Sequence, residues 1–198
     1  MYPKLFEKLI EDFMKLPGVG QKTATRYAFE MLENSDEFLK EFSEDLRDLK
    51  SKVKRCEVCG FLSEDDRCDI CKDEDRDRST IMVVTNVQDV VAVEKTRSYN
   101  GLYHVLGGNV NTAKGILPSD LNIDSLLRRI DDGVKEVIIA ISPTMDGEIT
   151  ALYLSKLLKD YEIKVTRLAS GLPMGANLDY TDDITITKAL TNRVDIGG

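Results

Sequence analysis

Residues 56–71 read CEVCGFLSEDDRCDIC and contain all four cysteines of this 198-residue chain. The cysteines form two Cys-x-x-Cys pairs, a spacing with which each pair can place two thiolates on one Zn²⁺ and the two pairs complete a tetrahedron. Because four thiolates leave no open coordination position, the stretch predicts one structural zinc ion per chain. There are two alternatives. A cytosolic location disfavours a pair of disulfides, and a redox-active Cys-x-x-Cys site does not need a second Cys-x-x-Cys pair nearby. The predicted ligands are Cys56, Cys59, Cys68 and Cys71.

The composition around this stretch is that of a soluble globular protein, with 42% apolar and 31% charged residues. No apolar run reaches the roughly 18–20 residues of a membrane span, and the acidic N-terminus does not resemble a signal peptide. We therefore expect a cytoplasmic protein with no membrane partner. His104 is the only histidine of the sequence, so catalysis by a Ser-His or Cys-His pair is nearly excluded. Its apolar surroundings in YHVL predict a hydrogen-bonded, partly buried side chain.

The net charge of −8 argues, taken alone, against a nucleic-acid partner. The charge is unevenly distributed, however. Residues 1–55 carry equal numbers of acidic and basic side chains, whereas the excess of acid is concentrated in residues 56–79. A local basic surface therefore remains possible in the N-terminal segment.

The segment before the cysteines is predicted to be helical. Apolar residues recur at helical spacing in residues 5–14, 24–32 and about 35–53, and Pro17-Gly18-Val19-Gly20 separates the first two runs. The apolar stripe of the first run, which includes Leu5 and Leu9, fits either a core or a subunit interface.

The stretch LPGVGQKTATRYAFEML, residues 16–32, resembles a helix-hairpin-helix DNA-binding motif. Gly18 and Gly20 allow a tight turn and a close approach to a ligand. Free amides at the start of the following helix can donate to a phosphate, with help from the helix dipole. Lys22 and Arg26 lie four residues apart and thus on one helix face beside that anion site. The alternative is an ordinary helical corner with a solvated cationic face.

The segment after the cysteines alternates strands and helices, which predicts a parallel sheet with helices on both faces. The run KEVIIAI, residues 135–141, is expected to be a central strand because both of its faces are apolar. The other expected strands cover residues 80–84, 103–106 and 163–169, and the expected helices cover residues 87–95, 123–130, 147–161 and 184–192.

The segment SPTMDGE, residues 142–148, follows the central strand, where sites form in such sheets. This half of the chain resembles a Toprim domain, whose enzymes hold Mg²⁺ with a Glu after the first strand and an Asp-x-Asp pair after a later one. Here Ser142 and Thr144 replace the pair, and Thr85-Asn86 follows the first strand. Since Mg²⁺ needs hard anionic oxygen ligands, the resemblance implies a folded but non-catalytic Toprim domain.

The order of these parts resembles the RecR family of bacterial recombination mediators over about residues 5–192. The resemblance implies an α+β multidomain fold. It comprises a helical helix-hairpin-helix region, a four-cysteine zinc finger, an α/β Toprim domain with a parallel sheet, and a C-terminal helical assembly segment. The expected boundaries are 1–54, 55–78, 79–174 and 175–198.

The resemblance also implies a non-enzymatic function in recombinational DNA repair after DNA damage. Members act with RecO and RecF to load RecA onto single-stranded or gapped DNA, and they assemble through their terminal regions into homotetrameric rings through which DNA can pass. The stretch around residues 171–183 is similar to a segment tied to that assembly. The alternative is a Toprim-type Mg²⁺-dependent nuclease or primase with an atypical ligand set.

Individual residues of this sequence match the functional positions of the family. Gly18, Gly20, Lys22 and Arg26 match the DNA-contacting hairpin, and the four cysteines match the zinc ligands. Glu94, Asp146 and Glu148 lie on the surface by which the family engages RecO. Asp146 and Glu148 also fit the first turn of the following helix, where the helix dipole favours anions. Glu94 also fits pairing with Lys95 or Arg97 at an exposed helix end.

Overall fold

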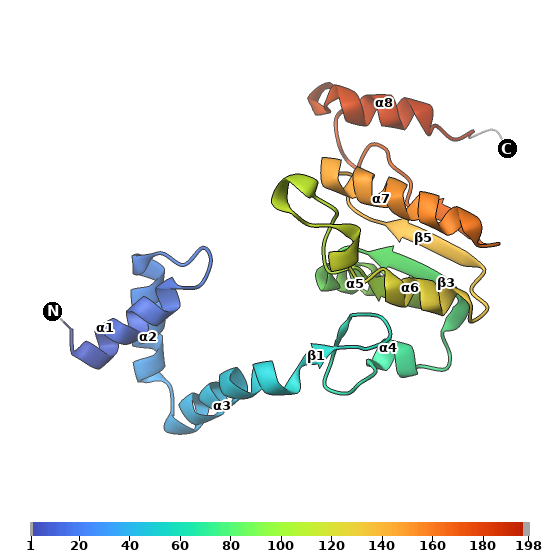
Figure 1. Ribbon diagram of the computed structural model, residues 1–198. Helices are drawn as coiled ribbons and strands as arrows, with labels where there is room; N and C mark the ends of the chain where they lie inside the picture. Colours follow the sequence, from blue (N-terminus) through green and yellow to red (C-terminus); the bar gives the residue numbers. More distant parts are fainter. Residues whose placement is uncertain (1, 196–198) are drawn as a thin grey trace. The chain divides into compact units, whose positions relative to one another are not determined.

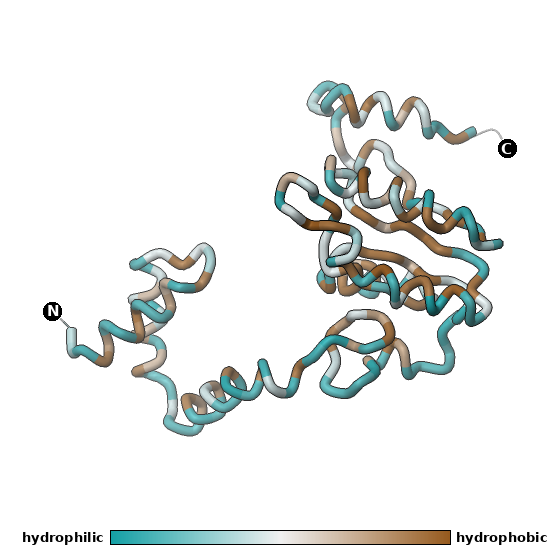
Figure 2. Tube along the Cα trace, viewed as in Figure 1, coloured by the Kyte–Doolittle hydropathy of each residue, from teal (hydrophilic) through white to brown (hydrophobic). Residues whose placement is uncertain are grey.

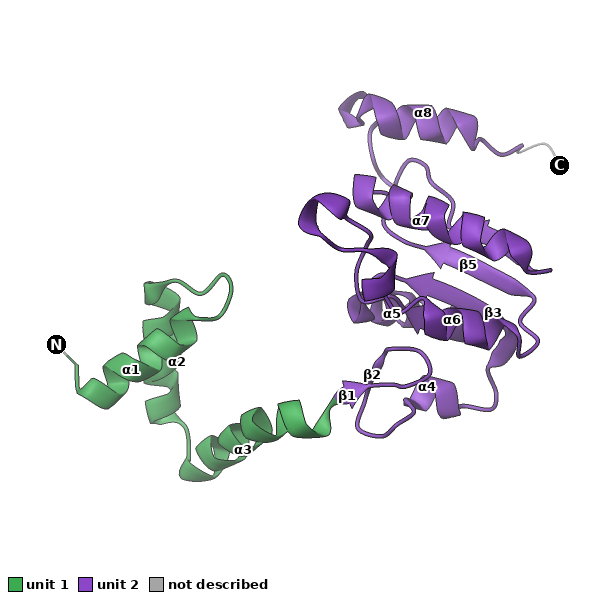
Figure 3. Ribbon diagram, viewed as in Figure 1, with its two compact units in different colours: residues 1–53 green, residues 54–198 purple. Residues whose placement is uncertain are grey.

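A computed structural model describes residues 2–195 of the chain. The chain forms two compact units, residues 1–53 and 54–198 (Figure 3). The first unit is helical. The second contains the cysteine segment, a parallel sheet with its helices, and a C-terminal helix, so the predicted mixed fold is confirmed.

The first unit contains α1 (Lys4–Met14), α2 (Gln21–Glu33) and α3 (Asp36–Lys52). Its small core lies between α1 and α2 and buries Phe6 and Ile10 against Ala24 and Ala28. Small alanines allow the two helices to approach closely. Helix α3 starts at a Ser35 cap, whose Oγ accepts a hydrogen bond from the Phe38 amide at 3.2 Å. None of the residues of α3 is buried.

The second unit begins with a small knuckle that contains the cysteines. A two-stranded antiparallel ribbon, β1 (Lys54–Arg55) with β2 (Leu62–Ser63), is followed by the short helix α4 (Asp69–Lys72). We call residues 54–73 the zinc knuckle. These elements are too short to show a periodic pattern in the sequence.

The sheet contains β3 (Asp77–Val84), β4 (Gly101–Val105), β5 (Glu136–Ala140) and β6 (Lys164–Arg167). Its order is β4-β3-β5-β6 and all pairings are parallel (Figure 1). The predicted central position of β5 is confirmed, since it pairs with β3 on one side and β6 on the other. The second unit also contains α5 (Val87–Glu94), α6 (Asp124–Ile130), α7 (Met145–Leu157) and α8 (Asp183–Thr191).

Helices cover both faces of the sheet, as predicted. One face packs Val83 and Ile139 against Leu126 of α6 and Leu154 of α7. The opposite face packs alternate strand residues against α5 and against Phe61 of the zinc knuckle. Figure 2 shows the strands as largely apolar segments, as expected of a sheet that is buried on two faces.

Several element boundaries differ from those expected. Strand β4 begins at Gly101 rather than at residue 103, because its ladder with β3 starts at the Asp77–Gly101 pair. Helix α7 begins two residues earlier than expected, because the Thr144 hydroxyl caps it by accepting from the Gly147 amide at 3.2 Å. It ends at Leu157 and continues as a single 3₁₀ turn.

Candidate functional site

The four cysteines form a closed metal site in the zinc knuckle. Their Sγ atoms all lie within 4.8 Å of one another, and Sγ atoms that share one zinc at about 2.3 Å are separated by about 3.8 Å. All four are free thiols and are at most 2% exposed. Four buried thiols this close together fit one Zn²⁺ ion with no open coordination position. Among residues 2–195, they are the one group of three or more such side chains placed to share a metal.

The zinc knuckle is attached to the edge strand of the sheet. The Val105 amide of β4 donates to the Cys59 carbonyl at 2.7 Å. Gly60, at φ +76°, lies so close to this strand that an added Cβ would be 2.9 Å from the Val105 carbonyl oxygen. The knuckle therefore occupies a sheet edge that would otherwise expose unpaired backbone groups.

The hairpin between α1 and α2 has the geometry of an anion site. Gly18 has φ +78°, a left-handed conformation that favours glycine. Gly20 precedes α2 without a side-chain cap, and the first turn of α2 contains no acidic residue. Within the described part of the chain, no acceptor is assigned to the amides of residues 20–23. These amides are therefore free to donate at the positive end of the α2 helix dipole, where a phosphate oxygen can accept hydrogen bonds from them.

Lys22 and Arg26 lie beside these amides on the exposed side of α2, opposite the buried Ala24 and Ala28. Neither side chain makes an ion pair within residues 2–195, and the Arg26 guanidinium lies 5.8 Å from the Tyr27 ring centroid. The structure thus brings the four predicted DNA-contacting residues of the hairpin to one exposed surface.

The Toprim segment after β5 holds its two carboxylates in protein contacts. Asp146 accepts from the Asn111 side-chain amide at 2.6 Å. Glu148 is bound by Arg167 of β6 through both Nη atoms, at 2.7 and 2.8 Å, and by Lys188 of α8 at 2.9 Å. These hydrogen bonds and charges lower the pKa of Glu148 to about 2.

The positions where Toprim enzymes carry acids have structural roles here. Thr144 caps α7, and the buried Thr85 donates to the Asn109 side-chain oxygen at 3.2 Å. The Ser142 carbonyl lies so close to Gly147 that an added Cβ would be only 2.0 Å away. The start of α7 is therefore packed directly against the end of the strand.

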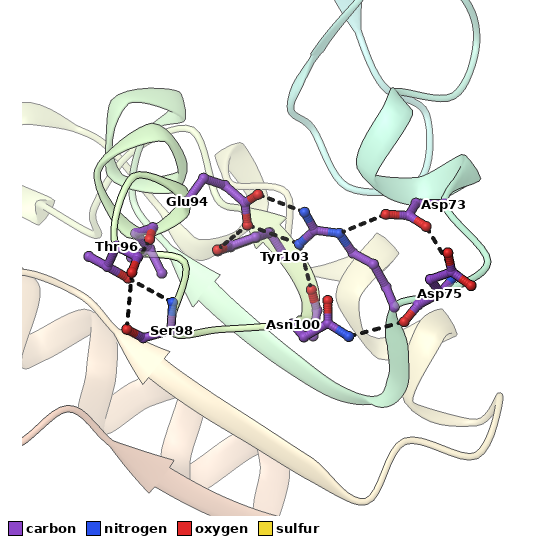
Figure 4. Close-up of polar contacts among 10 residues, drawn as sticks. Asp73, Asp75, Glu94, Thr96, Ser98, Asn100 and Tyr103 are labelled. Atoms are coloured by element: carbon purple, nitrogen blue, oxygen red, sulfur yellow. Dashed lines mark hydrogen bonds and ion pairs between the residues drawn. The ribbon is translucent and has the colours of Figure 1, made fainter.

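Glu94 is bound near the amino ends of β3 and β4, whereas Asp146 follows the carboxyl end of β5. It ends α5, and both of its oxygens bind the guanidinium of Arg76, just before β3, at 2.9 and 2.6 Å (Figure 4). The Tyr103 hydroxyl donates to the same carboxylate at 2.6 Å. Arg76 lowers the pKa of Glu94. The pairing with Lys95 or Arg97 that the sequence suggested is not the one observed, because the fold brings Arg76 to this carboxylate.

His104 is fully buried and doubly hydrogen-bonded. Its Nε2 donates to the Asn122 carbonyl at 2.5 Å, and its Nδ1 accepts from Arg129 Nη1 at 3.1 Å. Burial, the main cause, lowers the pKa of His104 to about 4. The expectation of a structural histidine is confirmed. The sequence does not distinguish the buried Arg129 beside it from the exposed Arg128, because the two arginines are adjacent and share the same local pattern.

Family models match four consecutive parts of the chain. They are the RecR helix-hairpin-helix (residues 6–50), the four-cysteine zinc finger domain of RecR (53–73), a Toprim domain (79–169) and the RecR C-terminal region (171–194). Curated relatives named "Recombination protein RecR" are similar over 196 residues, which is 98% of this chain and 99% of theirs. The relative from Lactococcus lactis subsp. cremoris is 50% identical, and those from Staphylococcus aureus and Staphylococcus haemolyticus are each 48% identical.

The fold and the sites thus define a multidomain protein that joins a helix-hairpin-helix, a structural four-cysteine zinc site and a Toprim domain without the usual metal ligands. The chain belongs to the RecR family of recombination proteins. Its role is therefore in recombinational repair. Among the described residues, none of the helices combines the length and apolar character needed to cross a membrane.

Proposed function

We propose that this chain is a non-catalytic, DNA-binding recombination mediator. In this proposal it acts in the cytoplasm with RecO and RecF to load RecA onto single-stranded or gapped DNA. The observation that carries the proposal is the hairpin surface, where the unpaired amides of residues 20–23 lie beside the exposed Lys22 and Arg26. The same phosphate geometry is present at any base sequence, so binding is expected to follow DNA structure rather than sequence.

Binding by one hairpin is expected to be weak, because the chain as a whole carries a net charge of −8 and each hairpin offers only two cations. Several hairpins on one DNA raise the overall affinity by multivalency, without any new contact. This reasoning favours an assembly of several chains around DNA.

The first unit supplies a surface that suits such an assembly. A groove of about 800 Å³ between its three helices is almost wholly apolar. Leu5, Leu32 and Leu46 line it and are 81%, 66% and 59% exposed. Apolar surface of this extent is typical of an interface. We assign it to a second copy of the chain within the homotetrameric ring that the family resemblance implies.

The assembly is tested by light scattering coupled to size exclusion. Leu5→Glu with Leu32→Glu is expected to reduce the mass below that of the wild-type oligomer, because charges would be buried at the interface. Lys8→Glu introduces a glutamate by reversing the charge at an exposed position of α1 outside the groove lining, and it should leave the mass unchanged. An unchanged mass for the leucine variant would exclude this surface as the interface.

RecO contact is proposed for the Toprim carboxylates. Asp146 and Glu148 lie together at the start of α7, whereas Glu94 is bound by Arg76 near the amino ends of β3 and β4. Asp146→Arg is therefore expected to weaken binding of purified RecO more than Asp160→Arg, a matched change at an exposed position near the end of α7. Equal binding by both variants would contradict this assignment.

The DNA contact is tested by fluorescence anisotropy with labelled gapped DNA. Replacing both Lys22 and Arg26 by Ala should weaken binding and reduce the slope of log affinity against log salt by up to about 2, because up to two phosphate contacts are lost per hairpin. Lys4 and Lys8 are also exposed and four residues apart, on α1, so their double Ala variant is the matched control. Equal affinity and salt slope for the hairpin variant and the wild type would overturn the proposal.

A further inference from the structure

Arg129 of α6 carries a buried charge next to the zinc knuckle. The residue is 9% exposed. Its Nη1 atom donates to the Tyr103 carbonyl at 2.6 Å and to His104 Nδ1 at 3.1 Å, both neutral acceptors. Its Nη2 atom is buried and has no hydrogen-bond partner within the described chain. A buried guanidinium with one unpaired nitrogen is costly unless a negative group compensates it.

The groups that can compensate Arg129 are the zinc ligands. A small cavity of about 140 Å³ is lined by both Arg129 and Cys71. Burial lowers the pKa of Arg129, and the four cysteines, Cys71 most strongly, act against that shift. Four thiolates around one Zn²⁺ carry two net negative charges, which themselves require positive partners in a buried setting.

Other charged groups at this cavity do not take that place. Asp132 also lines the cavity, but it is exposed and forms no ion pair with Arg129 in the described residues. Arg67 donates to the Cys71 carbonyl at 3.2 Å, so it adds a second cation beside the same ligand. Arg78 also lines the cavity, so three cations and one carboxylate surround the space beside Cys71.

We propose that Arg129 is the counter-charge of the zinc tetrathiolate and that it couples zinc binding to the edge of the Toprim sheet. The side chain anchors on Tyr103 and His104 of β4 through one nitrogen and leaves the other for the metal centre. Zinc binding in the knuckle is then stabilised by a residue of α6, an element that lies far along the chain from the cysteines. Arg129 is a positioning residue in this role, because it contacts no zinc itself.

The test is zinc affinity, measured by competition with a chromophoric chelator on the full-length protein. Arg129→Met, which keeps an unbranched stem and removes the charge, is expected to weaken zinc binding roughly 10–100-fold, as losses around metal ligands typically do. Arg129→Lys keeps the charge and should weaken it clearly less. Arg128→Met, an exposed neighbour on the same helix, should leave the affinity unchanged.

A purely structural role makes different predictions. If Arg129 serves only its bonds to β4, Arg129→Met would destabilise zinc-bound and zinc-free protein equally and leave the zinc affinity unchanged, which would overturn the proposal. Equal losses of zinc affinity in Arg129→Lys and Arg129→Met would overturn the proposal too, since the charge would then be irrelevant. Should Arg129→Met not fold, Arg129→Gln takes its place. The proposal is then contradicted if Arg129→Gln binds zinc no more weakly than Arg129→Lys does. If Asp132→Asn weakens zinc binding as much as Arg129→Met, the carboxylate rather than Arg129 governs the site and the proposal fails.

Discussion

Arg167 binds Glu148 with both of its Nη atoms, at 2.7 and 2.8 Å. Lys188 donates to the same carboxylate at 2.9 Å. Two protein cations therefore neutralise this carboxylate, which follows the Ser142–Thr144 positions where Toprim enzymes carry their Asp-x-Asp pair. The contact also ties α8 to the sheet, since Lys188 belongs to α8 and Arg167 to β6. The degenerate site is thus used as a structural joint.

Replacing Glu148 by Gln is expected to loosen α8. The bridge is partly exposed, so its loss should lower the free energy that holds α8 in place by no more than about 1 kcal/mol. Hydrogen exchange in α8 should then be faster by up to roughly fivefold. Because the pKa of Glu148 falls from 4.5 to about 2 in the fold, the bridge stabilises fully above pH 4.5 and is lost as the pH falls toward 2. Glu162→Gln, at an exposed position, is the control. Unchanged exchange in α8 would argue against the joint.

The same geometry predicts that the protein leaves DNA intact. Labelled gapped DNA incubated with Mg²⁺ or Mn²⁺ should be neither cleaved nor extended, because Glu94 is bound by Arg76 and Glu148 is bound by Arg167 and Lys188. Asp146→Ala should change nothing in this assay. Cleavage or synthesis that disappears in Asp146→Ala would establish a Toprim enzyme and refute the mediator.

The sequence was most informative where the signal is local. Four cysteines at a fixed spacing predicted the zinc site, and Thr144 could have been recognised as the cap of α7. The contacts of Glu148 and Glu94 were not predictable, because they depend on how the strands are ordered. Lys188 is 40 residues from Glu148 and Arg76 is 18 residues from Glu94. Local charge patterns instead suggested neighbours such as Lys95, and the observed partners come from other elements.

His104 predicts a specific dependence of stability on pH. Its pKa falls from 6.5 to about 4 in the fold, so the unfolded chain binds the proton more tightly. The neutral ring therefore stabilises the fold fully above pH 6.5, and up to about 3 kcal/mol is lost as the pH falls toward 4. Denaturant unfolding in excess zinc should show that the free energy of unfolding of His104→Gln falls less than that of the wild type over this pH range. Equal falls in the free energy of unfolding for the variant and the wild type would contradict this account.

Removal of zinc is expected to destabilise the second unit. Metal binding and folding are coupled in four-cysteine sites, with apparent binding free energies on the order of 10 kcal/mol at neutral pH. A strong chelator, or Cys56→Ser, should therefore lower the melting temperature by on the order of 10 °C. Glu64→Gln, a change at an exposed position of the same knuckle that is not a ligand, is the control. A melting temperature that is insensitive to both treatments would rule out a structural metal.

The mediator function itself is tested most directly by the rate of RecA loading onto gapped DNA that is coated with single-strand binding protein, with RecO present. The wild-type chain should accelerate loading, and the Lys4→Ala, Lys8→Ala control should accelerate it equally. Lys22→Ala with Arg26→Ala should lose most of the acceleration, because the hairpin no longer holds the DNA. Loading that the hairpin variant accelerates as fast as the wild type does would contradict the account.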